Sequence, residues 1–182
     1  MKRSFKTEGV VLKRRNFGEA DKLLTVFTPF YGKIAVLAKG IRKIHSRKAP
    51  HLEVFSHVNL FIACGKSLDI VTEVETLETF HFLRTQLTRI AYAYRTVEEV
   101  DRLCAEKEVH KEIFPLLLNI LRKLNDKKIT NVEIIVEEFT CQLLWILGYL
   151  PRENILKGET LSRFLENVME RHLKSDSFLT KI

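Results

Sequence analysis

The chain has 182 residues, 46% of them hydrophobic, and a formal net charge of +7. This size provides a buried core for one large domain or two small ones. Its apolar runs, such as Leu143–Leu150, are far shorter than the roughly 20 residues that a membrane-spanning helix requires. The first residues are positively charged but lack the apolar segment of a signal peptide, so we expect a cytoplasmic protein.

Positive charge is concentrated in the first part of the chain. Residues 1–50 contain 13 Lys or Arg and 3 acidic residues, whereas residues 51–182 contain 17 and 20. Charge of one sign spread over a long segment repels itself unless a polyanion offsets it. The asymmetry therefore predicts a polyanionic partner for the first part of the chain.

Short apolar or β-branched runs occupy residues 5–79 and predict five strands. Turn residues separate them at 16–18, 28–32 and 64–66, and the longest connection is the 39–52 segment. Five closely connected strands suit a small closed or partly open β-barrel, whose faces and loops can hold an oligonucleotide.

From about residue 80 the apolar residues recur every three or four positions, which is typical of amphipathic helices. In the first helical segment, Tyr94 belongs to the apolar stripe and Arg89 lies off it. In the last helical segment, Thr160 is a plausible N-cap. Each stripe needs a partner face, so a helical bundle is expected. The stripes lie at residues 83–97, 113–124, 132–147 and 161–168.

The two patterns together predict an α+β protein with two domains. The first is a barrel over residues 1–79, and the second is an all-α domain over residues 80–182, with no flexible linker between them. We expect the barrel to bind nucleic acid and the helices to dock protein partners.

Patterns that mark enzymes and metal sites are missing from the sequence. The seven glycines form neither a P-loop nor a dinucleotide-binding turn, and the six histidines lack the close spacing of metal ligands. Cys64, Cys104 and Cys141 are far apart, so we expect buried thiols in a reducing compartment. The sequence thus predicts no metal ion, no cofactor and no enzymatic activity, although a catalytic triad formed only in the fold leaves no spacing pattern.

Lysine and arginine residues gather in the turns and the longest connection of the strand region. The stretch Lys39–Lys48, KGIRKIHSRK, contains no acidic residue. In the turns of the strand region, aromatic residues lie among the cations. Single-strand-binding proteins combine cations along the backbone with rings on which bases stack. The candidate DNA-binding residues are Lys13, Arg14, Arg15, Phe17, Lys22, Tyr31, Lys33, Lys39, Arg42, Lys43, Arg47 and Lys48.

Other interpretations of these residues stay open. The rings could plug the ends of the barrel while the cations only keep its surface soluble. A targeting signal normally lies on a disordered tail, whereas Lys39–Lys48 lies between two strand patterns. The following residues, Ala49–Leu52, could begin a short helix or cap that bridges the third and fourth strands.

Several stretches also match a known pattern in residue type and spacing. Thr7–Lys43 contains GEADKLLTVF followed by GKIAVLAKG, and His51–Phe80 continues into the helical region. Together with Leu143–Pro151 and Phe164–Leu179, they resemble the RecO family of bacterial DNA repair and recombination mediators. The resemblance covers nearly the whole chain.

This resemblance implies an N-terminal OB-fold followed by a helical domain. RecO-like proteins bind single- and double-stranded DNA and anneal complementary strands, including strands coated with single-strand-binding protein. With their partner RecR they help RecA load onto coated DNA, and no nucleotide is hydrolysed. The expected location is the cytoplasm, in association with the nucleoid. By the match of positions, the first candidates for DNA contact are Lys13, Arg14, Arg15, Lys39, Arg42 and Lys43.

The chain departs from the family pattern at one place. Many relatives carry a cysteine cluster, typical of a zinc site, soon after a GYxP stretch, but here Gly148–Pro151 is followed by RENILKGET. We therefore predict no zinc.

The tail of single-strand-binding proteins is acidic with an apolar tip, so its docking site would need an apolar pocket rimmed by cations. The helical region offers Arg84, Arg89, Arg95, Arg122 and Lys123. The alternative to a mediator is a non-enzymatic interaction scaffold whose basic barrel binds RNA or an acidic protein.

Overall fold

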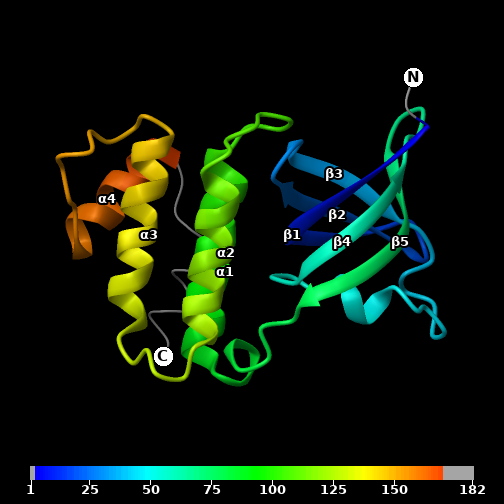
Figure 1. The fold of residues 1–182 in the computed structure, drawn as a ribbon, viewed down its shortest axis with the longest axis horizontal. Helices are drawn as coiled ribbons and strands as arrows, with labels where there is room; N and C mark the ends of the chain where they lie inside the picture. Colours follow the sequence, from blue (N-terminus) through cyan, green and yellow to red (C-terminus); the bar gives the residue numbers. More distant parts are fainter. Residues whose placement is uncertain (1–2, 170–182) are drawn as a thin grey trace. The chain divides into compact units, whose positions relative to one another are not determined.

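The computed structural model describes residues 3–169, which form a five-stranded barrel and a group of helices (Figure 1). The chain divides into two compact units, one containing the residues up to Thr79 with Ala105–Phe114, the other containing Phe80–Cys104 and the residues from Pro115 onward. The α+β fold class is as predicted. The stretch Phe164–Leu179 lies partly outside the described residues. Within residues 3–169, no helix is both long enough and apolar enough to span a bilayer.

The barrel has the five strands that the sequence predicts. They close in the order β1-β2-β3-β5-β4, and each neighbouring pair is antiparallel except β3 and β5, which are parallel. This is the arrangement of a small OB-type barrel. The strands are β1 (Ser4–Phe17), β2 (Asp21–Thr28), β3 (Gly32–Ala38), β4 (His57–Ala63) and β5 (Asp69–Glu78).

Strand β1 closes the barrel because it is long enough to serve two neighbours. Its first half pairs with β4 and its second half with β2, and the register shifts between Val11 and Lys13. A bulge of this kind bends a strand and increases its twist, which a closed sheet requires.

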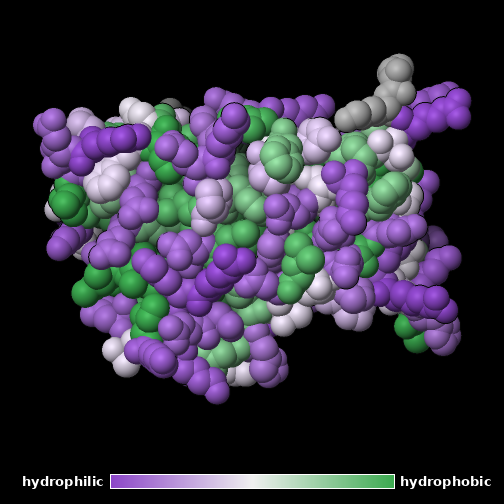
Figure 2. Space-filling model, in the orientation of Figure 1, coloured by the Kyte–Doolittle hydropathy of each residue, from purple (hydrophilic) through white to green (hydrophobic). Residues whose placement is uncertain are grey.

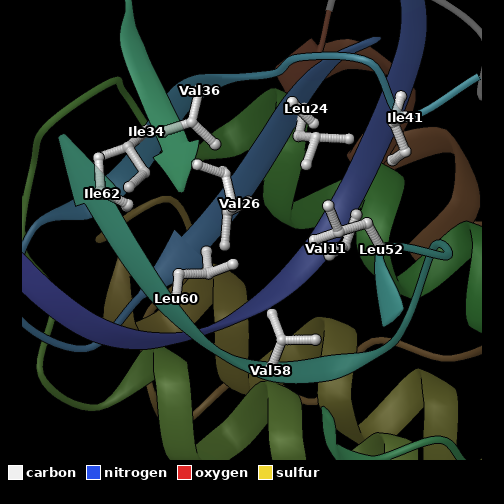
Figure 3. Close-up of a cluster of buried hydrophobic side chains, with 12 residues drawn as sticks. Val11, Leu24, Val26, Ile34, Val36, Ile41, Leu52, Val58, Leu60 and Ile62 are labelled. Atoms are coloured by element: carbon white, nitrogen blue, oxygen red, sulfur yellow. The ribbon is translucent and has the colours of Figure 1, made fainter. Parts of the chain in front are cut away.

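Side chains that alternate along the strands fill the barrel (Figure 3). Two further core residues, Ile41 and Leu52, come from the connection between β3 and β4 and are 3% and 0% exposed. This connection therefore forms part of the barrel's core as well as of its surface. The strand residues of the core are Val11, Leu24, Val26, Ile34, Val36, Ala38, Val58, Leu60, Ile62 and Val71.

A segment distant in sequence completes the edge of β3. The parallel pairing of β3 with β5 covers only Val36 and Leu37. Closer to the start of β3, the carbonyl of Lys33 accepts a hydrogen bond from the N–H of Lys107 at 2.9 Å. Gly32 has a φ of +62°, and a Cβ atom there would lie 2.0 Å from the carbonyl oxygen of Glu108. Only glycine allows this close approach.

The helices follow the predicted stripes in number, with α1 at Leu87–Leu103, α2 at Ile113–Asn125, α3 at Val132–Ile146 and α4 at Gly158–Met169. A 3-10 turn, η2 (Leu83–Thr85), precedes α1 and contains the start of the first stripe. The proposed N-cap Thr160 is wrong, because α4 already begins at Gly158, whose N–H donates to Oε1 of Glu137 at 2.7 Å. A carboxylate from α3 thus takes the place of a local cap.

The orientation predicted for α1 is also wrong. Arg89 is only 8% exposed, whereas Tyr94 is 45% exposed. The guanidinium of Arg89 donates to the carbonyl oxygens of Leu124 at 2.7 Å and Asp126 at 3.1 Å. These carbonyls lie at the end of α2, where a helix has no N–H donors of its own for its last carbonyl groups, so the buried arginine satisfies them.

Candidate nucleic-acid interface

Three strand ends bring many of the predicted cations to one end of the barrel. Asn16 near the end of β1 pairs with Lys22 at the start of β2, and Lys22 pairs with Ala38 at the end of β3. Lys39 follows Ala38 directly, so the long basic connection starts beside the β1–β2 turn. Among the predicted site residues, those exposed at this end are Arg15, Phe17, Lys39, Arg42, Lys43 and Arg47, and Lys13 is exposed on β1.

Hydrogen bonds fasten the start of the basic connection to the β1–β2 turn. The N–H of Gly40 donates to Oδ1 of Asp21 at 2.7 Å. The backbone N–H of Arg42 donates to the carbonyl of Ala20 at 2.9 Å, and its guanidinium donates to the carbonyl of Glu19 at 3.0 Å. Buried Ile41 lies between these two anchors. The Asp21 carboxylate is thereby part of the scaffold of the basic surface.

The end of the same connection is held against β5. Nζ of Lys48 donates to the carbonyl of Val71 at 3.1 Å, and Nδ1 of His51 lies 2.7 Å from Oγ1 of Thr76. Ala49–His51 forms a 3-10 helix, η1, so of the short helix or cap that the sequence left open here, the structure has the helix. Lys48 is half-buried, because its side chain lies against β5 to reach this carbonyl.

The tip of the connection is a turn at Lys43–Ser46. The N–H of Lys43 bonds to the carbonyl of Gly40 at 3.1 Å, and the N–H of Ser46 bonds to the carbonyl of Lys43 at 2.9 Å. Ile44 lies in this turn and is 97% exposed. In Figure 2 the corner of the molecule around the β3–β4 connection is mainly hydrophilic, with hydrophobic surface beside it. We define the anchored stretch Lys39–Lys48 as the basic loop.

Some of the predicted site residues lie elsewhere or are engaged. Arg14 pairs in register with Leu24 of the core, and its guanidinium forms an ion pair with Glu53. Tyr31 and Lys33 lie at the opposite end of β3 from Lys39. Tyr31 packs on Phe5 with ring centroids 4.5 Å apart, and Lys33 is only 9% exposed. The structure does not bring these two residues to the basic loop.

Sequence reasoning missed two kinds of residue at this site. Acidic Asp21 is needed to hold the loop, and Ile44 projects from it. The signal for Asp21 is its position directly after a turn, where short acidic side chains often accept backbone hydrogen bonds. The signal for Ile44 is a single apolar residue between Lys43 and His45.

Models of one protein family match both parts of the chain. Residues 1–80 match the model described as Recombination protein O N terminal, and residues 84–154 match Recombination protein O C terminal. The chain belongs to the RecO family. It is thus a member of a family of DNA repair proteins, in agreement with the resemblance of the sequence.

Curated RecO proteins agree with this assignment. The DNA repair protein RecO of Roseiflexus sp. (strain RS-1) is 42% identical over 150 residues, which cover 82% of this chain and 52% of the relative. That of Pelotomaculum thermopropionicum is 36% identical over 147 residues, covering 81% and 56%. That of Dehalococcoides mccartyi (strain 195) is 34% identical over 147 residues, covering 81% and 57%. The chain spans about half the length of the curated relatives it matches.

A second surface of this RecO chain lies within the helical unit, where side chains of α2 and α3 line a shallow groove. Its apolar part comes from both helices, and Lys123 and Glu138 are charged groups on its lining. Two cations considered for a docking pocket are engaged elsewhere: Arg89 binds carbonyls, and Nε of Arg95 lies 2.9 Å from Oε1 of buried Glu99. The groove is lined by Leu116, Asn119, Ile120, Lys123, Ile135, Glu138, Phe139 and Gln142.

The cysteines of this RecO chain differ in their surroundings. Cys104 and Cys141 are buried as predicted, but Cys64 is exposed, because it follows β4 at the start of a tight turn. Burial raises the pKa of the Cys141 thiol, whose Sγ donates to the carbonyl of Leu156 at 3.2 Å. Among residues 3–169, no group of three or more His, Cys, Asp or Glu side chains is placed to hold a metal ion.

Proposed function

We propose that this RecO chain is a DNA repair and recombination mediator that binds single- and double-stranded DNA and anneals complementary strands. The observation that carries the proposal is the basic loop, which is anchored at both ends and has exposed Arg42, Lys43 and Arg47. An anchored loop loses little conformational freedom when it binds, so its cations contribute more of their attraction to affinity.

Electrostatics provide the mechanism. Two DNA strands repel each other through their phosphates, and cations that neutralise phosphate on both strands release counterions and lower this repulsion. Exposed Arg15 of β1 lies near the start of the basic loop and extends its positive surface. Such contacts carry affinity without sequence information, as a protein that anneals arbitrary strands requires. The proposal includes no catalytic step.

We also propose that the barrel over residues 1–79 provides the DNA-binding domain and residues 80–182 the partner-docking domain. The partners would be RecR and single-strand-binding protein, and RecA would act through them. The groove between α2 and α3 is the candidate for the acidic, apolar-tipped tail of the single-strand-binding protein. The apolar side chains on its lining would contact the tip of the tail and Lys123 its acidic residues, whereas Glu138 on the same lining carries the opposing charge. The protein would act in the cytoplasm at the nucleoid.

DNA binding is tested by fluorescence anisotropy with a labelled single-stranded DNA at several salt concentrations. We expect the logarithm of the association constant to fall with the logarithm of salt by about 0.7 for each phosphate neutralised. Complementary strands carrying a donor and an acceptor dye should anneal faster with the protein present. Binding that is weak or indifferent to salt would contradict the proposal. Tighter binding to RNA of the same sequence, without annealing, would favour the scaffold.

Tail docking is tested with a labelled peptide that carries the tail of a single-strand-binding protein. We expect Lys123→Glu to weaken peptide binding, because it reverses a charge on the lining of the groove. Lys157→Glu is the matched control, since Lys157 is exposed and does not line the groove. Equal effects of the two substitutions would remove the groove from the proposal.

A further inference from the structure

Two isoleucines of the basic loop have opposite surroundings. Ile41 is 3% exposed and belongs to the barrel core, whereas Ile44, three residues later, is 97% exposed. Single exposed apolar residues are common on protein surfaces. Ile44 differs because it occupies the tip of a turn, in a loop that is held in place on both sides of it.

Hydrogen bonds on both sides of Ile44 hold the loop that carries it. Before it, Gly40 is bonded to Asp21 and Arg42 to the β1–β2 turn. After it, Lys48 is bonded to Val71. These contacts hold both ends of the loop, and Ile44 lies in the turn between them. An apolar side chain is thus kept in solvent next to cations.

The side chains on either side of Ile44 define what it can meet. Arg42 and Lys43 precede it, Arg47 follows it, and all three are exposed, while residues 39–48 include no acid. When these cations hold a sugar-phosphate backbone, Ile44 lies within reach of the bases of that strand. In a duplex the base faces are stacked, and inserting an apolar wedge requires unstacking. In a single strand they are accessible.

We infer that Ile44 packs against the bases of single-stranded DNA held by the basic loop, and that this contact makes the loop prefer unpaired strands over duplex. The inference rests on the proposed function and adds to it a base-contacting residue. Contact with base faces tolerates any sequence, because every base has an apolar face.

The test compares two probes of equal length, an oligo-dT strand and a strand of abasic sites with the same number of phosphates. Ile44→Ser should lower affinity for oligo-dT by about fivefold, in line with the loss of one partly buried aliphatic side chain. It should leave affinity for the abasic strand and the slope against salt unchanged. Ile44→Phe should retain the difference between the two probes. Because the side chain is exposed, both variants are expected to fold, and their melting temperatures check this.

Phe30→Ser is the matched control. Phe30 is 74% exposed in the β2–β3 turn, at the opposite end of β3 from Lys39. The Phe30→Ser substitution should not alter binding to either probe. An Ile44→Ser variant that binds oligo-dT like the unchanged protein, or that loses affinity equally for both probes, would overturn the inference while leaving salt-dependent DNA binding intact. If the unchanged protein binds neither probe, the proposed function fails, and this inference fails with it.

Discussion

The N–H of Gly40 donates to Oδ1 of Asp21 at 2.7 Å, so the glycine of the basic loop is bonded to the first residue of β2. Hydrogen bonds to a charged acceptor are stronger than those between neutral groups. A negative charge at the base of a positively charged surface lowers the local potential. The Asp21 carboxylate therefore supports the site by holding the basic loop in position and not by its charge. Mutations can separate these two effects.

Asp21→Ala removes both the anchor and one negative charge. We expect it to weaken binding to single-stranded DNA, although charge alone would strengthen binding, because the basic loop loses its attachment to β2. The free energy of unfolding should fall by about 1–2 kcal/mol. Glu19→Ala is the control, since it removes the same charge but retains the carbonyl that accepts from Arg42. Tighter binding by both variants would show that the anchor is dispensable.

Reversing the charges of Arg42, Lys43 and Arg47 together should weaken DNA binding strongly and reduce its dependence on salt. For a single strand, the slope should fall by about 0.7 for each phosphate that the variant no longer neutralises. Base preference should stay the same, since phosphate contacts are blind to sequence. The control reverses Lys111, Arg152 and Lys157, which are exposed outside the basic loop. If both triple variants bind DNA equally weakly, only net charge matters.

His57 is a buried link between three strands of the barrel. Its Nε2 lies 2.9 Å from Oε2 of Glu8 on β1, its Nδ1 lies 3.1 Å from Oε1 of Glu78 on β5, and the residue is 5% exposed. Removing the imidazole would take a hydrogen-bond partner from both carboxylates. His57→Ala should lower the free energy of unfolding in urea by about 2–4 kcal/mol. His51→Ala, which affects a single contact with Thr76, should cost less.

The three thiols should react with a disulfide reagent at different rates. Exposed Cys64 should react rapidly with the reagent while the protein is still folded. Cys104 and Cys141 should react only on unfolding, and Cys141 is protected further because burial raises its pKa and thus lowers its thiolate fraction at a given pH. Raising the pH toward alkaline values should speed its modification. Mass spectrometry of the labelled protein identifies the sites, and early labelling of Cys141 would contradict its burial.

The sequence predicted the number and type of the elements because period and turn chemistry are local. It failed where side chains depend on distant partners. Arg89 looked like a surface residue of α1, yet the carbonyls at the end of α2 bury it. Cys64 was assigned to the core because free cysteines usually are buried, but its turn leaves it in solvent.

The sequence predicted only part of the candidate site, and the reason is similar. The sequence located the cations, but successive hairpins in an antiparallel sheet turn at opposite ends. This separates Tyr31 and Lys33 from Lys39. The acids Asp21 and Glu53 were missed as supports because their partners, Gly40 and Arg14, are far away along the chain.

The bond from Lys107 to the carbonyl of Lys33 connects residues more than 70 positions apart, with α1 between them in the sequence. During synthesis, the five strands have all left the ribosome before this bond can form. The start of β3 stays an uncovered strand edge until Ala105–Glu108 emerges, and such edges can pair with other chains. A nascent chain therefore cannot complete the barrel before the first helix has been made, and a fragment that ends at residue 80 lacks the segment that covers this edge.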